Sequence, residues 1–226
     1  MLRYCAQLEL HNERSWFHEN HKWYEEAKRD FLELTELLKF RVAETAGPAL
    51  AERLLYADAK DMLYRIPRDM RIRSDRPPYT PSWRAYISGD KHALWPVGYY
   101  YRIQPGDRSI FGTGGWCPDQ DWLRKVRGFI AENHERFSAA LAESGLPLEG
   151  DKLKRVPSGF DPLSPAAAFV KYKSWLVSEP FSDAELTDFD RFADRVAQTV
   201  LRLEPLRQFF DDAFAEKPKT VWDPMF

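Results

Sequence analysis

Cysteine is scarce in this chain of 226 residues, which contains only Cys5 and Cys117. Two cysteines provide neither a disulfide framework nor a cysteine-based zinc site. His18 and His21 lie three residues apart with Glu25 beyond them, and no further ligand is evident where a catalytic zinc needs three. The sequence therefore predicts no metal, no cofactor, and two free thiols in a reducing compartment.

Long apolar runs are also lacking. No stretch approaches the roughly 20 apolar residues of a membrane-spanning helix, and the first residues lack the apolar core of a signal peptide. We therefore expect a cytoplasmic protein with no membrane partner. An excess of one charge is missing as well, because 33 Lys and Arg face 35 Asp and Glu. A net charge of −2 argues against a generally basic nucleic-acid binder.

The sequence lacks the usual nucleophile motifs. It has no Gly-x-Ser-x-Gly elbow, and neither cysteine has a histidine close to it in sequence. Whether the protein is an enzyme stays open, as does its oligomeric state.

Aromatic residues, in contrast, are plentiful at 15% of the chain, enough for a compact core. Apolar residues at helical spacing predict helix from Asn12, the expected N-cap, to about Thr45, with a break at Lys28–Asp30. Helices are also expected from Pro118 to about Leu141, broken near Asn133, and over 189–214, interrupted at Pro205.

The middle of the chain has the pattern of strands. Alternating residues between turn-forming segments predict strands over 63–73, 83–88, 99–104 and 109–112. Short connections favour antiparallel pairing. The sequence thus predicts one α+β domain over residues 1–226, with N-terminal helices, a central mainly antiparallel sheet of about four strands and C-terminal helices.

The most informative segment runs from Arg65 to Tyr79 and is rich in arginine, without lysine. Guanidinium groups suit a bidentate grip on carboxylate or phosphate, or a buried ion-pair network. We expect the anion-binding residues to be Arg65, Arg68, Asp69, Arg71, Arg76, Tyr79 and Arg84. Asp69 would orient the arginines and Tyr79 would supply a hydroxyl.

These motifs resemble the DUF2461 family of bacterial proteins. The resemblance rests on Arg65-x-x-Arg68-Asp69-x-Arg71 with Asp75 and Tyr79, and on further matching pieces such as Gly98–Gly106, Gly114–Pro118 and Lys173-Ser174. Ile72 and Arg76 depart from the usual Phe and Lys and keep their character. The resemblance implies one domain of mixed helix and strand and assigns no activity.

Several interpretations stay open. The preferred hypothesis is an arginine-lined cleft for an anionic small molecule, and the alternative is a structural Arg–Asp network. Aromatic residues such as Tyr99 and Tyr101 raise nucleic-acid binding as a less favoured hypothesis, since no RNA-binding motif accompanies them. Gly114 and Gly115 precede an expected helix and could cradle phosphate, although ordinary turn geometry is favoured. Lys173 is a further candidate.

Overall fold

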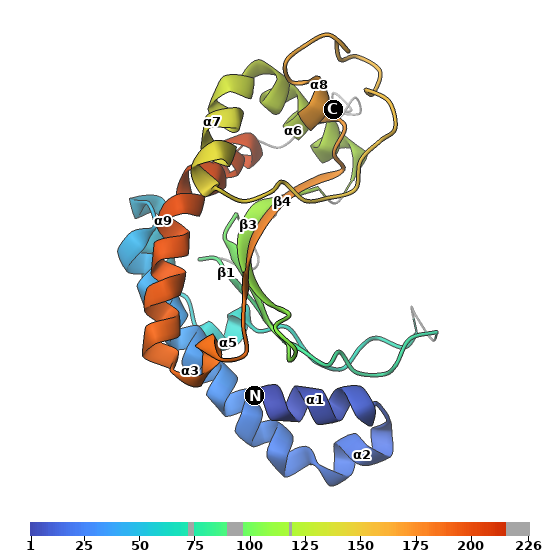
Figure 1. Cartoon of the computed structure of the whole chain (residues 1–226), viewed down its shortest axis with the longest axis vertical. Helices are drawn as coiled ribbons and strands as arrows, with labels where there is room; N and C mark the ends of the chain where they lie inside the picture. The colour runs from blue at the N-terminus through green and yellow to red at the C-terminus, as the bar shows by residue number, and fades with distance from the viewer. Residues whose placement is uncertain (72–74, 90–96, 118, 216–226) are drawn as a thin grey trace, which may run out of the picture. The chain divides into compact units, whose positions relative to one another are not determined.

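The computed structural model describes residues 1–71, 75–89, 97–117 and 119–215. Helices at both ends of the chain flank a four-stranded antiparallel sheet with the strand order β1-β2-β3-β4 (Figure 1). The predicted α+β layout is therefore confirmed. Among the described residues, no helix combines the length and the apolarity needed to cross a bilayer.

The elements have the following bounds. The N-terminal helices are α1 (Leu2–Leu10), α2 (Arg14–Glu19), α3 (His21–Thr45), α4 (Pro48–Leu55) and α5 (Ala59–Met62). The strands are β1 (Trp83–Ile87), β2 (Tyr99–Ile103), β3 (Ser109–Trp116) and β4 (Ser174–Phe181). The remaining helices are α6 (Gln120–Glu132), α7 (His134–Ser144), α8 (Ala167–Val170), the 3₁₀ turn η1 (Glu185–Thr187) and α9 (Phe189–Phe214).

The chain forms two compact units. Unit 1 comprises Met1–Ala93, Gly98–Phe111 and Glu179–Leu201, and unit 2 comprises Leu94–Val97, Gly112–Ser178 and Arg202–Phe226. The boundaries fall within β3, β4 and α9. Whether both units count as one domain stays a prediction.

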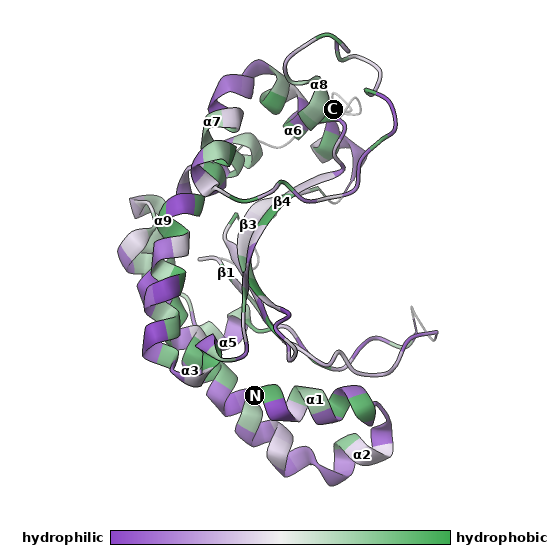
Figure 2. Cartoon of the chain, viewed as in Figure 1, coloured by the Kyte–Doolittle hydropathy of each residue, from purple (hydrophilic) through white to green (hydrophobic). Residues whose placement is uncertain are grey.

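In unit 1, one face of the β1–β2 ladder is buried and the other is half-exposed. Burial alternates along both strands, as the two-residue period of a strand requires. Helix α3 covers the buried face, where Phe31 contacts the rings of Trp83 and Tyr101. Colours alternate around α3 and α9 in Figure 2, as expected of helices with one apolar face.

The N-terminal helices differ from the prediction, which did not include α1, α4 or α5. The break falls at Asn20, whose side chain donates to the Trp16 carbonyl oxygen (2.9 Å), and the polar patch at 28–30 lies on an exposed face of α3. Asn12 is not the N-cap, which is Glu13. The Asn12 side chain instead holds the backbone N–H and C=O of Tyr79, each at 3.0 Å.

The expected strand over 63–73 is also wrong. Within its described part, residues 63–71, the structure has isolated bridges, Leu63 to Ala85 and Pro67 to Tyr79. In Figure 1 the segment is drawn as an irregular ribbon without a strand arrow. The strand the sequence analysis missed is β4. Ile72, Arg73 and Pro118 lie outside the described residues.

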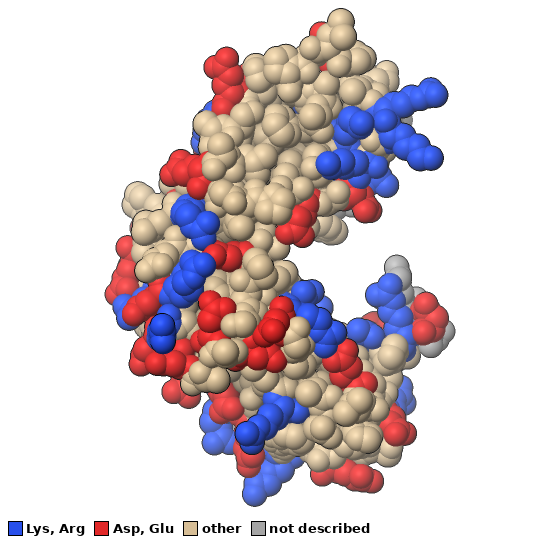
Figure 3. Space-filling model, viewed as in Figure 1, with Lys and Arg blue, Asp and Glu red and all other residues tan. Residues whose placement is uncertain are grey.

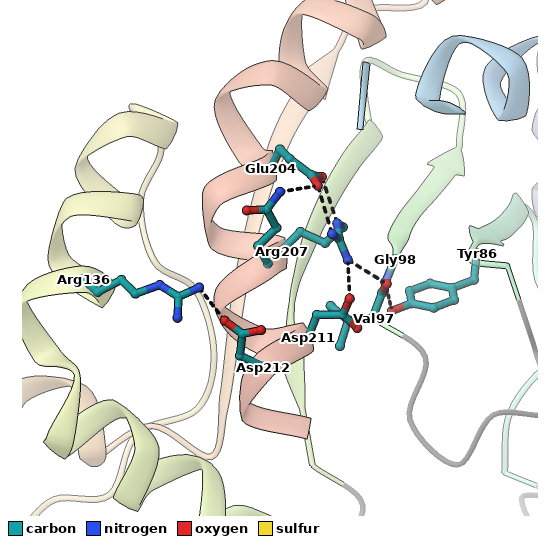
Figure 4. Close-up of polar contacts among 9 residues, drawn as sticks. Tyr86, Val97, Gly98, Arg136, Glu204, Arg207, Asp211 and Asp212 are labelled. Carbon is teal, nitrogen blue, oxygen red and sulfur yellow. Dashed lines mark hydrogen bonds and ion pairs between the residues drawn. The ribbon is translucent and has the colours of Figure 1, made fainter. Parts of the chain in front are cut away.

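In unit 2, a buried arginine shows what full charge compensation looks like in this protein. Arg207 donates to both carboxylate oxygens of Glu204 (2.8 and 2.9 Å), to Asp211 (3.2 Å) and to the Val97 carbonyl oxygen (3.4 Å), as Figure 4 shows. The residue is only 1% exposed. Its acidic partners make burial of the guanidinium tolerable.

Candidate functional site: an arginine face on the sheet

Two arginines lie directly opposite each other on the half-exposed face of the β1–β2 ladder. Arg84 of β1 pairs with Arg102 of β2 in the antiparallel register, which places their Cα atoms roughly 5 Å apart. Both side chains are partly buried. Like charges at directly opposite positions destabilise a sheet, so this pair has an unfavourable effect on folding.

The contacts of this pair are to backbone carbonyl groups. Arg84 Nη2 donates to the Arg65 oxygen (3.1 Å), and Arg102 Nη2 donates to the Arg108 oxygen (3.2 Å). The Nε atom of Arg102 is buried without a partner among the described residues. A guanidinium has five N–H donors, and among the described residues Arg84 and Arg102 each donate one hydrogen bond to the protein.

Arg68 and Arg76 add positive charge beside this pair. Arg68 Nε donates to the Thr80 hydroxyl and its Nη1 donates to the Pro77 carbonyl oxygen, both at 3.0 Å. Partial burial lowers the pKa of Arg68, and the positive charges of Arg76 and Arg84 lower it further. We call Arg68, Arg76, Arg84 and Arg102 the arginine face.

The arginine face lacks compensation by acidic groups. Within the part of the chain that the structure describes, none of its four guanidinium groups forms an ion pair with a carboxylate. Arg207 in unit 2 is the opposite case, with two acidic partners. In the view of Figure 3, acidic and basic side chains lie close together over much of the lower part of the surface, and a group of basic side chains stands at the upper right. The arginine face is thus a local excess of positive charge.

Comparison with known families agrees with the motifs of the sequence. The family model described as "Conserved hypothetical protein (DUF2461)" matches residues 1–209. The chain belongs to the DUF2461 family. No curated protein and no solved structure matches it. The family description names no substrate or reaction, so the chemistry of the site rests on its geometry.

Two residues of the DUF2461 motif satisfy each other. Arg71 donates to Asp69 through Nε (3.0 Å) and Nη2 (2.7 Å), and its backbone N–H donates to the same carboxylate (3.1 Å). This pair is exposed, and the hydrogen bonds from Arg71 lower the pKa of Asp69. The expected orienting role of Asp69 is therefore exerted on Arg71, and no contact between Asp69 and Arg84 or Arg102 is recorded. Arg65 has an exposed side chain and contributes its carbonyl oxygen to Arg84.

The tyrosines of the prediction lie in packed surroundings. Tyr79 is 7% exposed, and its ring stacks on Phe17 with the centroids 4.2 Å apart. Tyr99 stacks on Phe111 at 5.3 Å, and Tyr101 is fully buried with its hydroxyl bonded to Thr35. The structure therefore places Tyr99 and Tyr101 on the buried face of the ladder, away from the arginine face.

The glycines do not form a loop that opens a helix. Gly114 and Gly115 lie inside β3, and α6 begins later, capped by Asp119. A Cβ atom on Gly114 would lie 2.0 Å from the Trp175 carbonyl oxygen, and one on Gly115 would lie 2.5 Å from the Phe210 ring. Close packing explains both glycines. Lys173 belongs to unit 2 and has an exposed side chain.

A pocket of about 440 Å³ lies at the start of α9 in unit 1. It is lined by Ala184, Glu185, Thr187, Asp188, Arg191, Phe192 and Arg195. Three of its charged groups have structural partners. Arg195 pairs with Glu179, Glu185 accepts from Ser182 (2.8 Å), and Asp188 accepts from the Arg191 backbone (3.1 Å). The Arg191 side chain is exposed. The arginine face, with four guanidinium groups that lack a carboxylate partner among the described residues, is the stronger candidate.

The sequence analysis missed Arg102 and Tyr64 as members of the site. The signal available for Arg102 was the alternation of side chains along β1 and β2. This alternation, together with the pairing of the two strands, places Arg102 on the same face as Arg84. Tyr64 could not be found in this way. It is positioned by a bridge next to it, Leu63 to Ala85, and by its backbone N–H, which donates to the Arg84 carbonyl oxygen (2.9 Å).

Proposed function

We propose that this protein binds an anionic small molecule, bearing phosphate or carboxylate, on its arginine face. Arg84 and Arg102 would share the anion, with Arg68 and Arg76 adding to the positive potential. Arg65 and the Asp69–Arg71 pair would lie at its margin. The proposal concerns binding and names no catalytic residue.

One observation carries the proposal: Arg84 and Arg102 face each other without a carboxylate partner among the described residues. A structural ion-pair network would supply acidic groups, as Glu204 and Asp211 do for Arg207. An anion between two guanidinium groups would remove their repulsion and accept charge-assisted hydrogen bonds. The opposed pair is therefore better suited to a ligand than to stability.

Calorimetric titration with inorganic phosphate at low ionic strength tests this. We expect the wild type to bind, and Arg84→Gln and Arg102→Gln each to bind at least about tenfold more weakly, since a hydrogen bond to a charged group contributes about 1.5–3 kcal/mol. Arg124→Gln is the matched control, because Arg124 is exposed and paired with Asp121 outside the arginine face. Undetectable binding by the wild type, or equal weakening in the control, contradicts the proposal.

A further inference from the structure

Tyr64 places an accessible aromatic ring beside the arginine face. The residue is 49% exposed, although it is large and apolar in part. The Arg84 guanidinium lies over its ring, 5.5 Å from the centroid. The Tyr100 ring meets it at an angle of 64° with the centroids 6.3 Å apart. Contacts to Arg84 and Tyr100 thus hold the ring while about half of the residue meets solvent.

The backbone fixes this arrangement. The Tyr64 backbone N–H donates to the Arg84 carbonyl oxygen (2.9 Å). The Arg84 side chain donates to the carbonyl oxygen of Arg65, the residue after Tyr64. Tyr64, Arg84 and Arg102 therefore follow one another across three adjacent segments of unit 1. The half-exposed Tyr64 ring and the two guanidinium groups thus lie next to each other.

We infer that the ligand of the arginine face is a phosphate monoester of a planar heteroaromatic compound, of the mononucleotide class. This inference rests on the proposed function and adds a heteroaromatic ring to the anionic ligand. The ring of the ligand stacks on the Tyr64 side chain, and its phosphate lies between Arg84 and Arg102.

Charge favours phosphate over carboxylate. A phosphate monoester carries about −1.5 to −2 at neutral pH, against −1 for a carboxylate, and it offers three acceptor oxygens. Two opposed arginines, with Arg68 and Arg76 nearby, match the larger charge. Stacking of a base on an aromatic side chain strengthens binding by about fivefold or more and tolerates any base. Tyr64 provides an aromatic surface next to the arginine face.

The test compares three probes by calorimetry: inorganic phosphate, ribose 5-phosphate and adenosine 5′-monophosphate. We expect the nucleotide to bind about fivefold or more tightly than ribose 5-phosphate, which corresponds to the lower end of base stacking. Tyr64→Leu should remove this preference and leave the affinity for ribose 5-phosphate within about twofold. Tyr64→Trp should retain it. Tyr56→Leu is the control, since Tyr56 is 88% exposed and follows α4.

The outcomes separate the two proposals. Equal affinity for the nucleotide and ribose 5-phosphate overturns the inference and leaves anion binding intact. Failure of all three probes overturns both. If Tyr64→Leu still prefers the nucleotide to ribose 5-phosphate, the base binds to another surface, and the inference is contradicted. Single-stranded RNA whose affinity rises with strand length, well above that of the nucleotide, would assign the face to a polymer and also overturn it.

Discussion

At the scale of single residues, the arginines of this protein fall into two groups. Arg207 is buried beside Glu204 and Asp211, and its removal would take the guanidinium away from the buried Glu204 carboxylate. Arg84 and Arg102 repel each other across the ladder, and their hydrogen bonds within the described residues are to backbone oxygens. The first kind of arginine stabilises its surroundings, whereas the second kind is where we propose that an anion binds.

Substitution of Arg102 should separate these roles. We predict that Arg102→Gln leaves the free energy of unfolding unchanged or raises it by about 0.2–1 kcal/mol, because a like-charge cross-strand pair disappears. Urea denaturation measures the change. Arg207→Gln is the contrasting variant and should lose about 3–5 kcal/mol, the usual result of breaking a buried pair. A loss above about 1 kcal/mol in Arg102→Gln would indicate a structural role.

Cys117 provides a pH-dependent prediction. Its half-buried position raises the pKa of the thiol to about 12, and this effect outweighs the lowering by nearby Arg127. The thiolate is the reactive form, so alkylation by iodoacetamide should be slow at pH 8 and should still be accelerating at pH 10. In urea the chain is unfolded and an ordinary thiol titrates near pH 8.5, so the alkylation rate should level off at a lower pH than in the folded protein.

Mass spectrometry of the Cys117 peptide measures both rates. Equal pH profiles for the folded and unfolded chains would contradict the assigned environment. A fast, low-pH reaction of Cys117 in the folded protein would instead indicate an activated nucleophile.

At the scale of elements, β3 depends on glycine. Gly114 has φ of 152°, and an added Cβ would lie 2.0 Å from the Trp175 carbonyl oxygen in β4. We predict that Gly114→Ala lowers the free energy of unfolding by about 3 kcal/mol or more, since neither backbone can yield cheaply. Denaturant titration is the measurement.

Gly128 is the matched control for that substitution. It lies within α6, and nothing would lie within 4 Å of its added Cβ. Gly128→Ala should therefore stabilise the protein by about 0.5–1 kcal/mol through helix propensity. Similar effects of both substitutions would show that close approach of β3 and β4 is not what fixes Gly114.

Local patterns predicted some elements well. The apolar periodicity of α9 gave bounds that the structure confirms, Phe189–Phe214, and the alternation of residues gave β1 and β2 to within one residue. Pro205 was expected to interrupt α9 and does not. Its missing hydrogen bond would have ended at Leu201, an exposed residue where solvent can serve the carbonyl group.

Strand β4 was missed for a physical reason. Buried and less buried residues alternate along it, but Leu176 is exposed and Glu179 is buried, so hydropathy does not follow burial. Glu179 is tolerated inside because Arg195 and Thr199 bond to its carboxylate. Such compensation comes from distant parts of the chain and cannot be read from a local pattern.

At the scale of the whole molecule, net charge concealed the site. Basic and acidic residues nearly balance over 226 residues, with a net charge of −2. A local excess of positive charge appears where β1, β2 and the ribbon before them bring four arginines together. Sequence analysis identified Arg68 and Arg76 in the arginine-rich segment and Arg84 shortly after it. Arg102 required the register of the sheet, which depends on pairing between segments.

Some of the predicted site residues have partners of their own in the folded chain and do not join the arginine face. Asp69 and Arg71 satisfy each other on the surface, and Tyr79 packs on Phe17. The sequence could not separate these residues from Arg68 and Arg76, because all lie in the segment from Arg65 to Tyr79. Asp69, Arg71 and Tyr79 differ from the arginine face in the partners that they contact in the folded protein.

The most direct measurement is a crystal structure of the protein soaked with selenate, whose anomalous signal marks an anion unambiguously. We predict an anomalous peak within hydrogen-bond distance of both the Arg84 and the Arg102 guanidinium groups. That peak should be absent from crystals of Arg102→Gln. Wild-type crystals in which both side chains are ordered and bonded to carboxylates, with no anion between them, would contradict the account.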